Sequence, residues 1–210
     1  MTTATAELRD AAPRQAAPVI HPLWVRITHW INAVAVIVLV MSGWQIYNAS
    51  PLFAFEFSPS ITLGGWLAGA LLWHFAAMWL LVLNGLVYVA LGLVTGRFRK
   101  KLLPIRFSAL AADLKAALAF RLMRDDPSVY NTVQRLLYLG VIFAGVVVVL
   151  SGLAVWKPVQ FKALTALFGG YDAARYVHFF AMAAIVGFLI VHIVLAIIAP
   201  KTLRAMIIGR

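Results

Sequence analysis

Four of the five histidines in this chain lie in or beside long apolar stretches, where an ionisable side chain is unusual. They are His29, His74, His178 and His192, and the last two stand fourteen residues apart in RYVHFFAMAAIVGFLIVHIVLAIIAP. Ionisable groups inside a bilayer are rare, and they generally face the interior of a helix bundle. Neutral imidazole is also the commonest metal ligand in proteins. These four residues are therefore the first candidates for chemistry, whereas His21, which precedes the first stretch, is interpreted as an ordinary interfacial residue.

The composition predicts an integral membrane protein of one domain. The 210 residues are 63% hydrophobic and 12% charged, with a mean hydropathy of +0.92, whereas a soluble domain is about half apolar and a quarter charged. There is no cysteine, which excludes iron–sulfur clusters, covalently attached haem and disulfides. A metal or cofactor would therefore be held by histidine, methionine or carboxylates. The net charge of +11 lies in the connections between apolar stretches, so it indicates a membrane and not a nucleic acid.

Four stretches are long enough to cross a bilayer as helices, which takes about 20 residues each. We expect an all-α bundle of four transmembrane helices, ended by Pro200. The membrane domain is predicted to cover residues 21–205, between a flexible N-terminal tail, 1–20, and a C-terminal tail, 206–210. The expected spans are about 23–47, 63–94, 134–156 and 174–199.

The basic residues predict the orientation. Lys and Arg concentrate in the N-terminal arm, in the long connection between spans two and three, and in the C-terminal tail. By the positive-inside rule, both termini and this connection are expected on the cytoplasmic side of the membrane. Within the connection, RFSALAADLKAALAFRLMRDD has apolar residues at helical spacing, which predicts an amphipathic helix lying on the lipid surface. Asp126 and Pro127 are expected to cap the third span.

With this orientation the four histidines fall into two levels. His29 and His192, the inner pair, are expected in the cytoplasmic half, and His74 and His178, the outer pair, in the other half. Fourteen residues of helix separate His178 from His192 by about 21 Å and bring them within about 40° of one face. One helix would thus contribute one imidazole to each of two stacked sites.

Two imidazoles per level favour haem. Zinc and copper sites usually collect three or four ligands, whereas an electron-transfer haem is satisfied by two axial ligands. The sequence therefore predicts two haem b groups. Arg26 and Arg175 each precede a histidine of the set by three residues, and a guanidinium suits a haem propionate. Snorkelling arginines at helix ends explain the two equally well. Gly43, at the outer level, would give a flat macrocycle clearance.

At this point the residues resemble a known family. RITHWIN in span one, one histidine in span two, the pair in span four and YNTVQRLLYL at span three are similar to the bacterial di-haem b-type cytochromes. These include the cytochrome b subunits of nickel–iron hydrogenases, thiosulfate reductases and formate dehydrogenases, and the cytochrome b561 group. The resemblance covers residues 21–205. It implies that the inner pair binds one haem iron and the outer pair the other, and that the membrane is a bacterial inner membrane.

The resemblance also implies a function, namely electron transfer between a redox partner outside the membrane and the quinone pool, in either direction. The expected partner is a periplasmic redox subunit or soluble donor. Candidate quinone contacts are the polar and aromatic residues at the cytoplasmic start of span three, for which helix capping and interfacial anchoring are alternative roles. They are Asn131, Gln134, Arg135 and Tyr138.

Two other functions stay open. The same two haems could form a complete enzyme that oxidises superoxide and reduces quinone. A periplasmic subunit that co-purifies would favour the conduit, and quinone reduction by the isolated chain with superoxide would favour the enzyme. A cofactor-free transporter or scaffold would show no Soret absorption.

Overall fold

The computed structural model describes residues 19–101, 107–118 and 132–209. Every regular element in these ranges is a helix, so the predicted all-α class is confirmed. The elements are α1 (Leu23–Ala49), the 3-10 helix η2 (Pro59–Ile61), α2 (Leu67–Val94), α3 (Arg97–Lys101), α4 (Phe107–Leu118), α5 (Thr132–Trp156), α6 (Lys162–Leu167), α7 (Tyr171–Ile198) and α8 (Pro200–Ile208).

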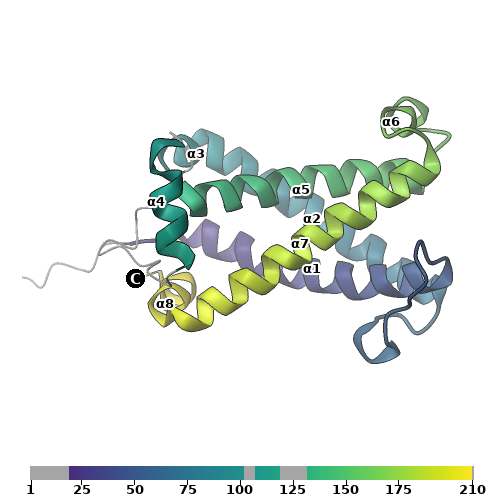
Figure 1. The fold of residues 1–210 in the computed structure, drawn as a ribbon, viewed down its shortest axis with the longest axis horizontal. Helices are drawn as coiled ribbons and strands as arrows, with labels where there is room; N and C mark the ends of the chain where they lie inside the picture. The colour runs from purple at the N-terminus through teal and green to yellow at the C-terminus, as the bar shows by residue number, and fades with distance from the viewer. Residues whose placement is uncertain (1–18, 102–106, 119–131, 210) are drawn as a thin grey trace, which may run out of the picture.

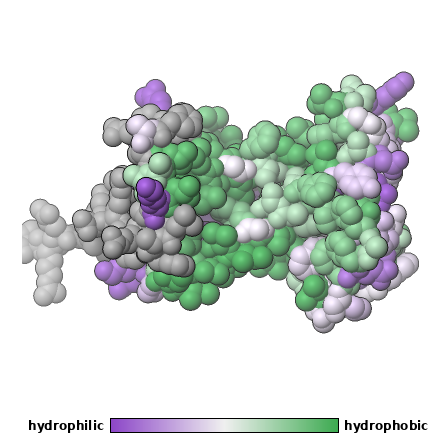
Figure 2. All heavy atoms as spheres, viewed as in Figure 1, coloured by the Kyte–Doolittle hydropathy of each residue, from purple (hydrophilic) through white to green (hydrophobic). Residues whose placement is uncertain are grey.

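Four of these helices are long and apolar enough to cross a membrane, which confirms the four-span prediction. Helices α1, α2, α5 and α7 have 27, 28, 25 and 28 residues and run along the long axis of the molecule (Figure 1). At 1.5 Å per residue each exceeds the hydrocarbon thickness of about 30 Å. Figure 2 shows a continuous apolar surface along the middle of the molecule, with hydrophilic residues gathered at both ends.

The helix boundaries differ from the predicted spans by a few residues. Helix α2 begins at Leu67 and not near residue 63, because Gly64 and Gly65 have φ angles of 112° and 71° and form a turn before it. Only glycine adopts such angles without strain. Helix α7 begins at Tyr171, three residues early, after Gly170 with a φ of 105°.

The four long helices form two hairpins. Helix α1 packs along α2, and α5 packs along α7, whereas few backbone contacts join one hairpin to the other. The buried residues in the described ranges are mostly small: Ala35, Ser42, Ala70, Ala77, Ser151, Ala154 and Ala174 are among them. A helix bundle stabilised by its own side chains usually buries large aliphatic and aromatic residues between its helices. Here the largest fully buried side chains among the described residues are those of Ser42 and Ser151, so large side chains contribute little to the core of this bundle.

Short helices distinguish the two ends of the bundle. Helices α3, α4 and α8 lie at one end, the α8 end, and α6 lies at the other end together with the connection of residues 50–66; we call this the α6 end (Figure 1). The described chain ends meet at the α8 end, where the Ile20 amide donates to the Gly209 carbonyl at 2.9 Å. Residues 206–208, predicted as tail, belong to α8. Pro200 ends α7 as predicted but also begins α8, because its missing N–H costs nothing in a first turn.

Residues 107–118 of the predicted amphipathic segment form α4, which lies across the α8 end (Figure 1). Its Asp113 carboxylate accepts a 2.8 Å hydrogen bond from the amide of Thr132, the first residue of α5. A carboxylate at this position satisfies one of the unpaired amides of a helix start. The expected capping residues, Asp126 and Pro127, lie outside the described residues.

Candidate functional site

The four histidines within the spans face one another as two pairs between the hairpins. The ring centres of His29 on α1 and His192 on α7 are 6.0 Å apart, with an angle of 56° between the ring planes. The ring centres of His74 on α2 and His178 on α7 are 6.4 Å apart, with an angle of 65°. Each pair therefore joins a helix of the first hairpin to α7 of the second.

These separations match the spacing that a shared metal ion imposes. With metal–nitrogen bonds of about 2.0–2.1 Å, two imidazoles on opposite sides of one ion have ring centres roughly 6.4 Å apart, given ring bonds of about 1.33 Å. Within the described ranges, no group of three or more histidine, aspartate or glutamate side chains is arranged to hold an ion. The donor set at each level is therefore two imidazoles, which suits the axial positions of haem iron. The separation of the hairpins likewise suits a flat, apolar group between them.

Each histidine of the outer pair is held by hydrogen bonds to the other helix of its hairpin. Nδ1 of His74 lies 3.1 Å from the Ser42 hydroxyl, and Nδ1 of His178 lies 3.2 Å from the Ser151 hydroxyl. Nδ1 of His178 also lies 2.9 Å from the Val148 carbonyl. Both rings are thus fixed through the same nitrogen, and Nε2 of each is left for another partner.

The inner pair has different surroundings. Nδ1 of His29 is buried and has no hydrogen-bond partner among the described residues. The ring of His192 stacks on Phe188, with ring centres 5.6 Å apart and planes 11° from parallel. Trp30 meets His29 edge-on at 5.1 Å. The inner imidazoles are therefore positioned by ring packing, whereas the outer imidazoles are positioned by hydrogen bonds.

A family model described as prokaryotic cytochrome b561 matches residues 20–209, almost the whole chain and all four histidines of the two pairs. The chain belongs to the prokaryotic cytochrome b561 family. The expected resemblance to bacterial b-type cytochromes is confirmed, and membership of a cytochrome b family implies that the chain binds haem b. The fit of each histidine pair to haem iron agrees with this family.

A relative of this cytochrome b561 family member is known from Azospira oryzae. The two chains are 54% identical over 190 residues, which cover 90% of this chain and 96% of the relative. That protein is named as a protein-methionine-sulfoxide reductase subunit, YedZ1, an assignment that is itself provisional.

The two arginines expected near haem propionates also have partners of their own. Arg26 donates through its guanidinium to the carbonyl of Ile207 in α8, while its Nε is buried without a partner among the described residues. Arg175 donates to the carbonyl and the hydroxyl of Ser50 at 2.6 and 3.1 Å. Each arginine therefore ties its helix to a segment at the end of the bundle, and the propionate role stays a prediction.

Three of the four quinone candidates lie on the first two turns of α5, at the α8 end. Gln134, Arg135 and Tyr138 are all partly exposed, and each takes part in interactions within the structure. Asn131 lies outside the described residues. The quinone role of these residues stays a prediction.

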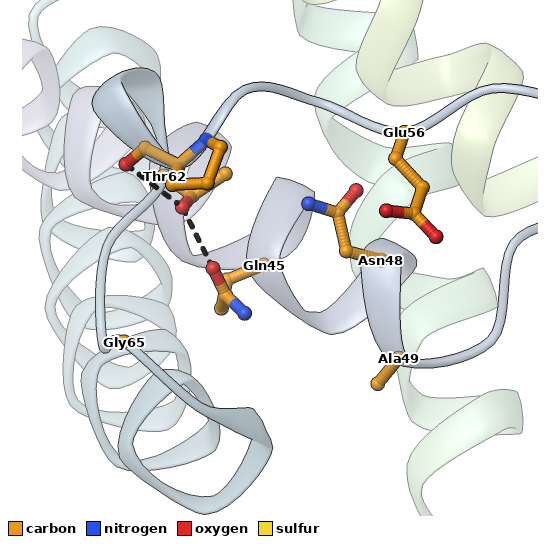
Figure 3. A pocket seen from close by; sticks show the side chains of 7 residues that line it. Gln45, Asn48, Ala49, Glu56, Thr62 and Gly65 are labelled. Atoms are coloured by element: carbon orange, nitrogen blue, oxygen red, sulfur yellow. Dashed lines mark hydrogen bonds between the residues drawn. The ribbon is translucent and has the colours of Figure 1, made fainter.

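At the α6 end of this cytochrome, the connection of residues 50–66 folds back on α1 and leaves a polar pocket. Its lining includes Gln45, Asn48, Glu56 and Thr62 (Figure 3). Thr62 donates to the Gln45 side chain at 2.7 Å. The Asn48 side chain both donates to and accepts from the backbone of Phe57, at 2.8 and 2.9 Å. The connection is thus fixed to the end of α1, near the level of the outer pair.

Aromatic side chains join the same connection to α7. The ring of Phe53 lies 5.3 Å from that of Phe179 and 6.1 Å from that of Phe180, and these two residues directly follow His178. Sequence reasoning missed this cluster, although the alternation FAFEF in residues 53–57 is a visible signal. It also missed Ser42, Ser151 and Asn84, which contact or flank the histidines.

Proposed function

We propose that this protein is a membrane di-haem cytochrome b that carries electrons between a periplasmic redox partner and the quinone pool. The observation that carries the proposal is the pair of facing imidazoles at each of two levels of the bundle. The inner pair, His29 and His192, would hold one haem, and the outer pair, His74 and His178, the other. Haem b supplies reversible one-electron redox chemistry when it is bound.

The protein residues supply position and environment. The four imidazoles fix the two sites on three helices, and α7 sets their spacing because it carries one ligand of each. The apolar helices would keep water away from a haem between the hairpins, and the shielding of a metal group from solvent tunes its potential. Arg26 and Arg175 offer positive charge near the two ends, where it would offset acidic propionates.

The distribution of charge supports an orientation with the α8 end in the cytoplasm. Among the described residues, the Lys and Arg of α3 and α8 lie on that side, and the α6 end has only Lys157, Lys162 and Arg175. Cytoplasmic connections are the ones enriched in Lys and Arg. The quinone candidates of α5 would then face the cytoplasmic half of the bilayer, and the connection of residues 50–66 would face the periplasm.

The relative from Azospira oryzae suggests the class of partner. Its name makes it a subunit of a protein-methionine-sulfoxide reductase. We therefore propose that the partner of this chain is the catalytic subunit of a reductase of this class, docked at the α6 end. Reduction of one sulfoxide to a thioether and water consumes two electrons and two protons. Electrons would then run from quinol, through this chain, to the partner.

Haem quantitation in the purified full-length protein tests the proposal. A reduced-minus-oxidised spectrum should show b-type haem at two per chain. His178→Ala and His192→Ala should each retain one haem, because each variant loses a ligand of only one pair. His21→Ala, outside the spans, is the matched control and should retain two.

The same measurement tests the cofactor-free alternative. A protein without Soret absorption would be a cofactor-free transporter or scaffold and would refute the proposal. A single haem in the unmodified chain would refute the assignment of two sites.

A further inference from the structure

A repeated sequence lies against the outer histidine pair. Residues 38–43 read VLVMSG and residues 147–152 read VVVLSG, the first on α1 and the second on α5. In each hairpin the Ser-Gly dipeptide of one helix meets the histidine of the other: Ser42 with His74, and Ser151 with His178. Ser42 and Ser151 are also the largest fully buried side chains in the described part of the chain.

The glycine of each dipeptide gives the imidazole room. A Cβ atom at Gly152 would lie 3.1 Å from Cε1 of His178, and one at Gly43 would lie 3.4 Å from Cε1 of His74. The repeat therefore places a hydroxyl and a bare backbone against the same edge of each ring. The same arrangement occurs in both hairpins, and in each it contacts a histidine of the outer pair. We therefore attribute the repeat to contact with the histidine and not to the packing of one hairpin.

The hydroxyl hydrogens determine the direction of the hydrogen bonds. Ser42 Oγ lies 2.6 Å from the carbonyl of Val38, and Ser151 Oγ lies 2.7 Å from the carbonyl of Val147. A carbonyl can only accept, and a serine has one hydroxyl hydrogen, so each serine donates to its own helix. Its oxygen must then accept from the N–H at Nδ1 of the histidine.

The carbonyl of Val148 gives the same answer independently for His178, because it also accepts from Nδ1 at 2.9 Å. This network assigns the proton of both outer imidazoles to Nδ1. A neutral imidazole with its proton on Nδ1 has its free lone pair on Nε2. The two serines thus select the tautomer in which Nε2 can bind a metal.

We infer that Ser42 and Ser151 are positioning residues that orient the outer haem ligands and lower the reduction potential of the outer haem. The inference rests on the proposed function, since it requires the two haems. A histidine that donates its second N–H is a stronger donor to its metal, which stabilises the ferric state. The buried Nδ1 of His29 lacks a partner among the described residues, so the inner haem does not receive the same effect from that ligand.

The test is a redox titration of the full-length protein with Ser42→Ala, Ser151→Ala and the double substitution. Ser42→Ala should raise the potential of the outer haem, shifting its ferric-to-ferrous ratio at fixed ambient potential by roughly fivefold, the usual effect of one hydrogen bond. Ser151→Ala should raise it less, because the Val148 carbonyl still accepts from Nδ1 of His178. The double variant should shift further. The inner haem should keep its potential, and Ser42→Thr, which retains a hydroxyl, should restore that of the outer haem.

Thr28→Val is the matched control. Thr28 is buried, at 4% exposure, and its hydroxyl donates to Trp24 within its own helix at 2.8 Å, as the two serines do, but it contacts neither outer histidine. The outer potential should not change in this variant.

Each outcome decides one point. Unchanged outer potentials in the serine variants, with both haems bound, would overturn the inference and leave the proposed function intact. Loss of the outer haem alone from the double variant, with both haems kept by Thr28→Val, would support a positioning role. Absence of haem from the unmodified protein would refute the proposed function itself.

Discussion

At Gly152, a single added methyl group would press against the imidazole of His178. The ring of His178 is held on that side by the Ser151 hydroxyl and the Val148 carbonyl, so it cannot easily move from a Cβ atom 3.1 Å from its Cε1. At Gly43 the corresponding distance to His74 is 3.4 Å, an ordinary contact. The two glycines should therefore tolerate a methyl group to different degrees.

Gly152→Ala is expected to disturb the outer site more than Gly43→Ala does. Forcing a methyl group into a packed site costs about 1–3 kcal/mol, so Gly152→Ala should lower the occupancy of the outer haem or shift its low-spin EPR signal. Gly145→Ala on the same helix is the control, because nothing lies within 4 Å of its added Cβ. Equal spectra for Gly152→Ala and Gly145→Ala would show that a methyl group at residue 152 does not disturb His178.

At this scale the sequence predicted the histidines but not what touches them. His29, His74, His178 and His192 stand out because each is an ionisable residue in an apolar stretch. Serine and glycine are common in membrane helices as packing residues, so Ser42 and Ser151 carry no such signal alone. Their contacts depend on how two helices are rotated against each other, which a single sequence does not specify. Only the repetition of Ser-Gly after a run of valine and leucine was available as a signal.

Between the elements, Asn84 fixes α2 against α1 beside His29. Its side-chain amide donates to the Thr28 carbonyl at 2.8 Å and to the Asn32 side chain at 2.7 Å. Asn84 is only 8% exposed, so both hydrogen bonds are sheltered from water. The two acceptors bracket His29 along α1, and the contact therefore sets the register of the first hairpin at the inner level.

Asn84→Leu should destabilise the first hairpin. Hydrogen bonds between membrane helices average about 0.6 kcal/mol and reach about 1.7 kcal/mol, so losing two should cost about 1–2 kcal/mol. The thermal unfolding midpoint in detergent should fall, and the inner haem should be lost before the outer one. Leu83→Ala changes a neighbouring side chain that is 59% exposed and serves as control. A midpoint equal to that of the control would show that the two hydrogen bonds of Asn84 contribute no stability.

Helices that follow from the length of an apolar run were predictable from the sequence. Helix boundaries that depend on backbone conformation were less so. All four spans follow from apolar runs of more than 20 residues. The start of α2 was misplaced because the residues from Leu63 to Trp66 are apolar but form a turn around Gly64 and Gly65. Helix α8 was partly interpreted as tail, since its nine residues are too few for a span and its contacts to α1 are not visible in sequence.

On the scale of the whole molecule, the two ends of the bundle differ in charge and in structure. The α8 end is strongly basic and gathers the chain ends and the amphipathic α4, as expected of a surface next to acidic lipid. The α6 end has a fixed connection, an aromatic cluster against α7 and the polar pocket around Glu56 (Figure 3). A partner reaching the outer pair would meet this second surface, so the orientation decides which compartment the partner must occupy.

The absence of cysteine makes that orientation directly measurable, because any thiol label reports only an introduced residue. Ser60→Cys lies in the exposed connection at the α6 end, and Thr202→Cys lies exposed on α8. With the α8 end in the cytoplasm, a membrane-impermeant maleimide added to intact spheroplasts should label Ser60→Cys and leave Thr202→Cys unlabelled. After permeabilisation both should react, and the unmodified chain should react in neither condition. Labelling of Thr202→Cys alone in intact spheroplasts would show the opposite orientation. The partner would then meet the outer pair from the cytoplasm.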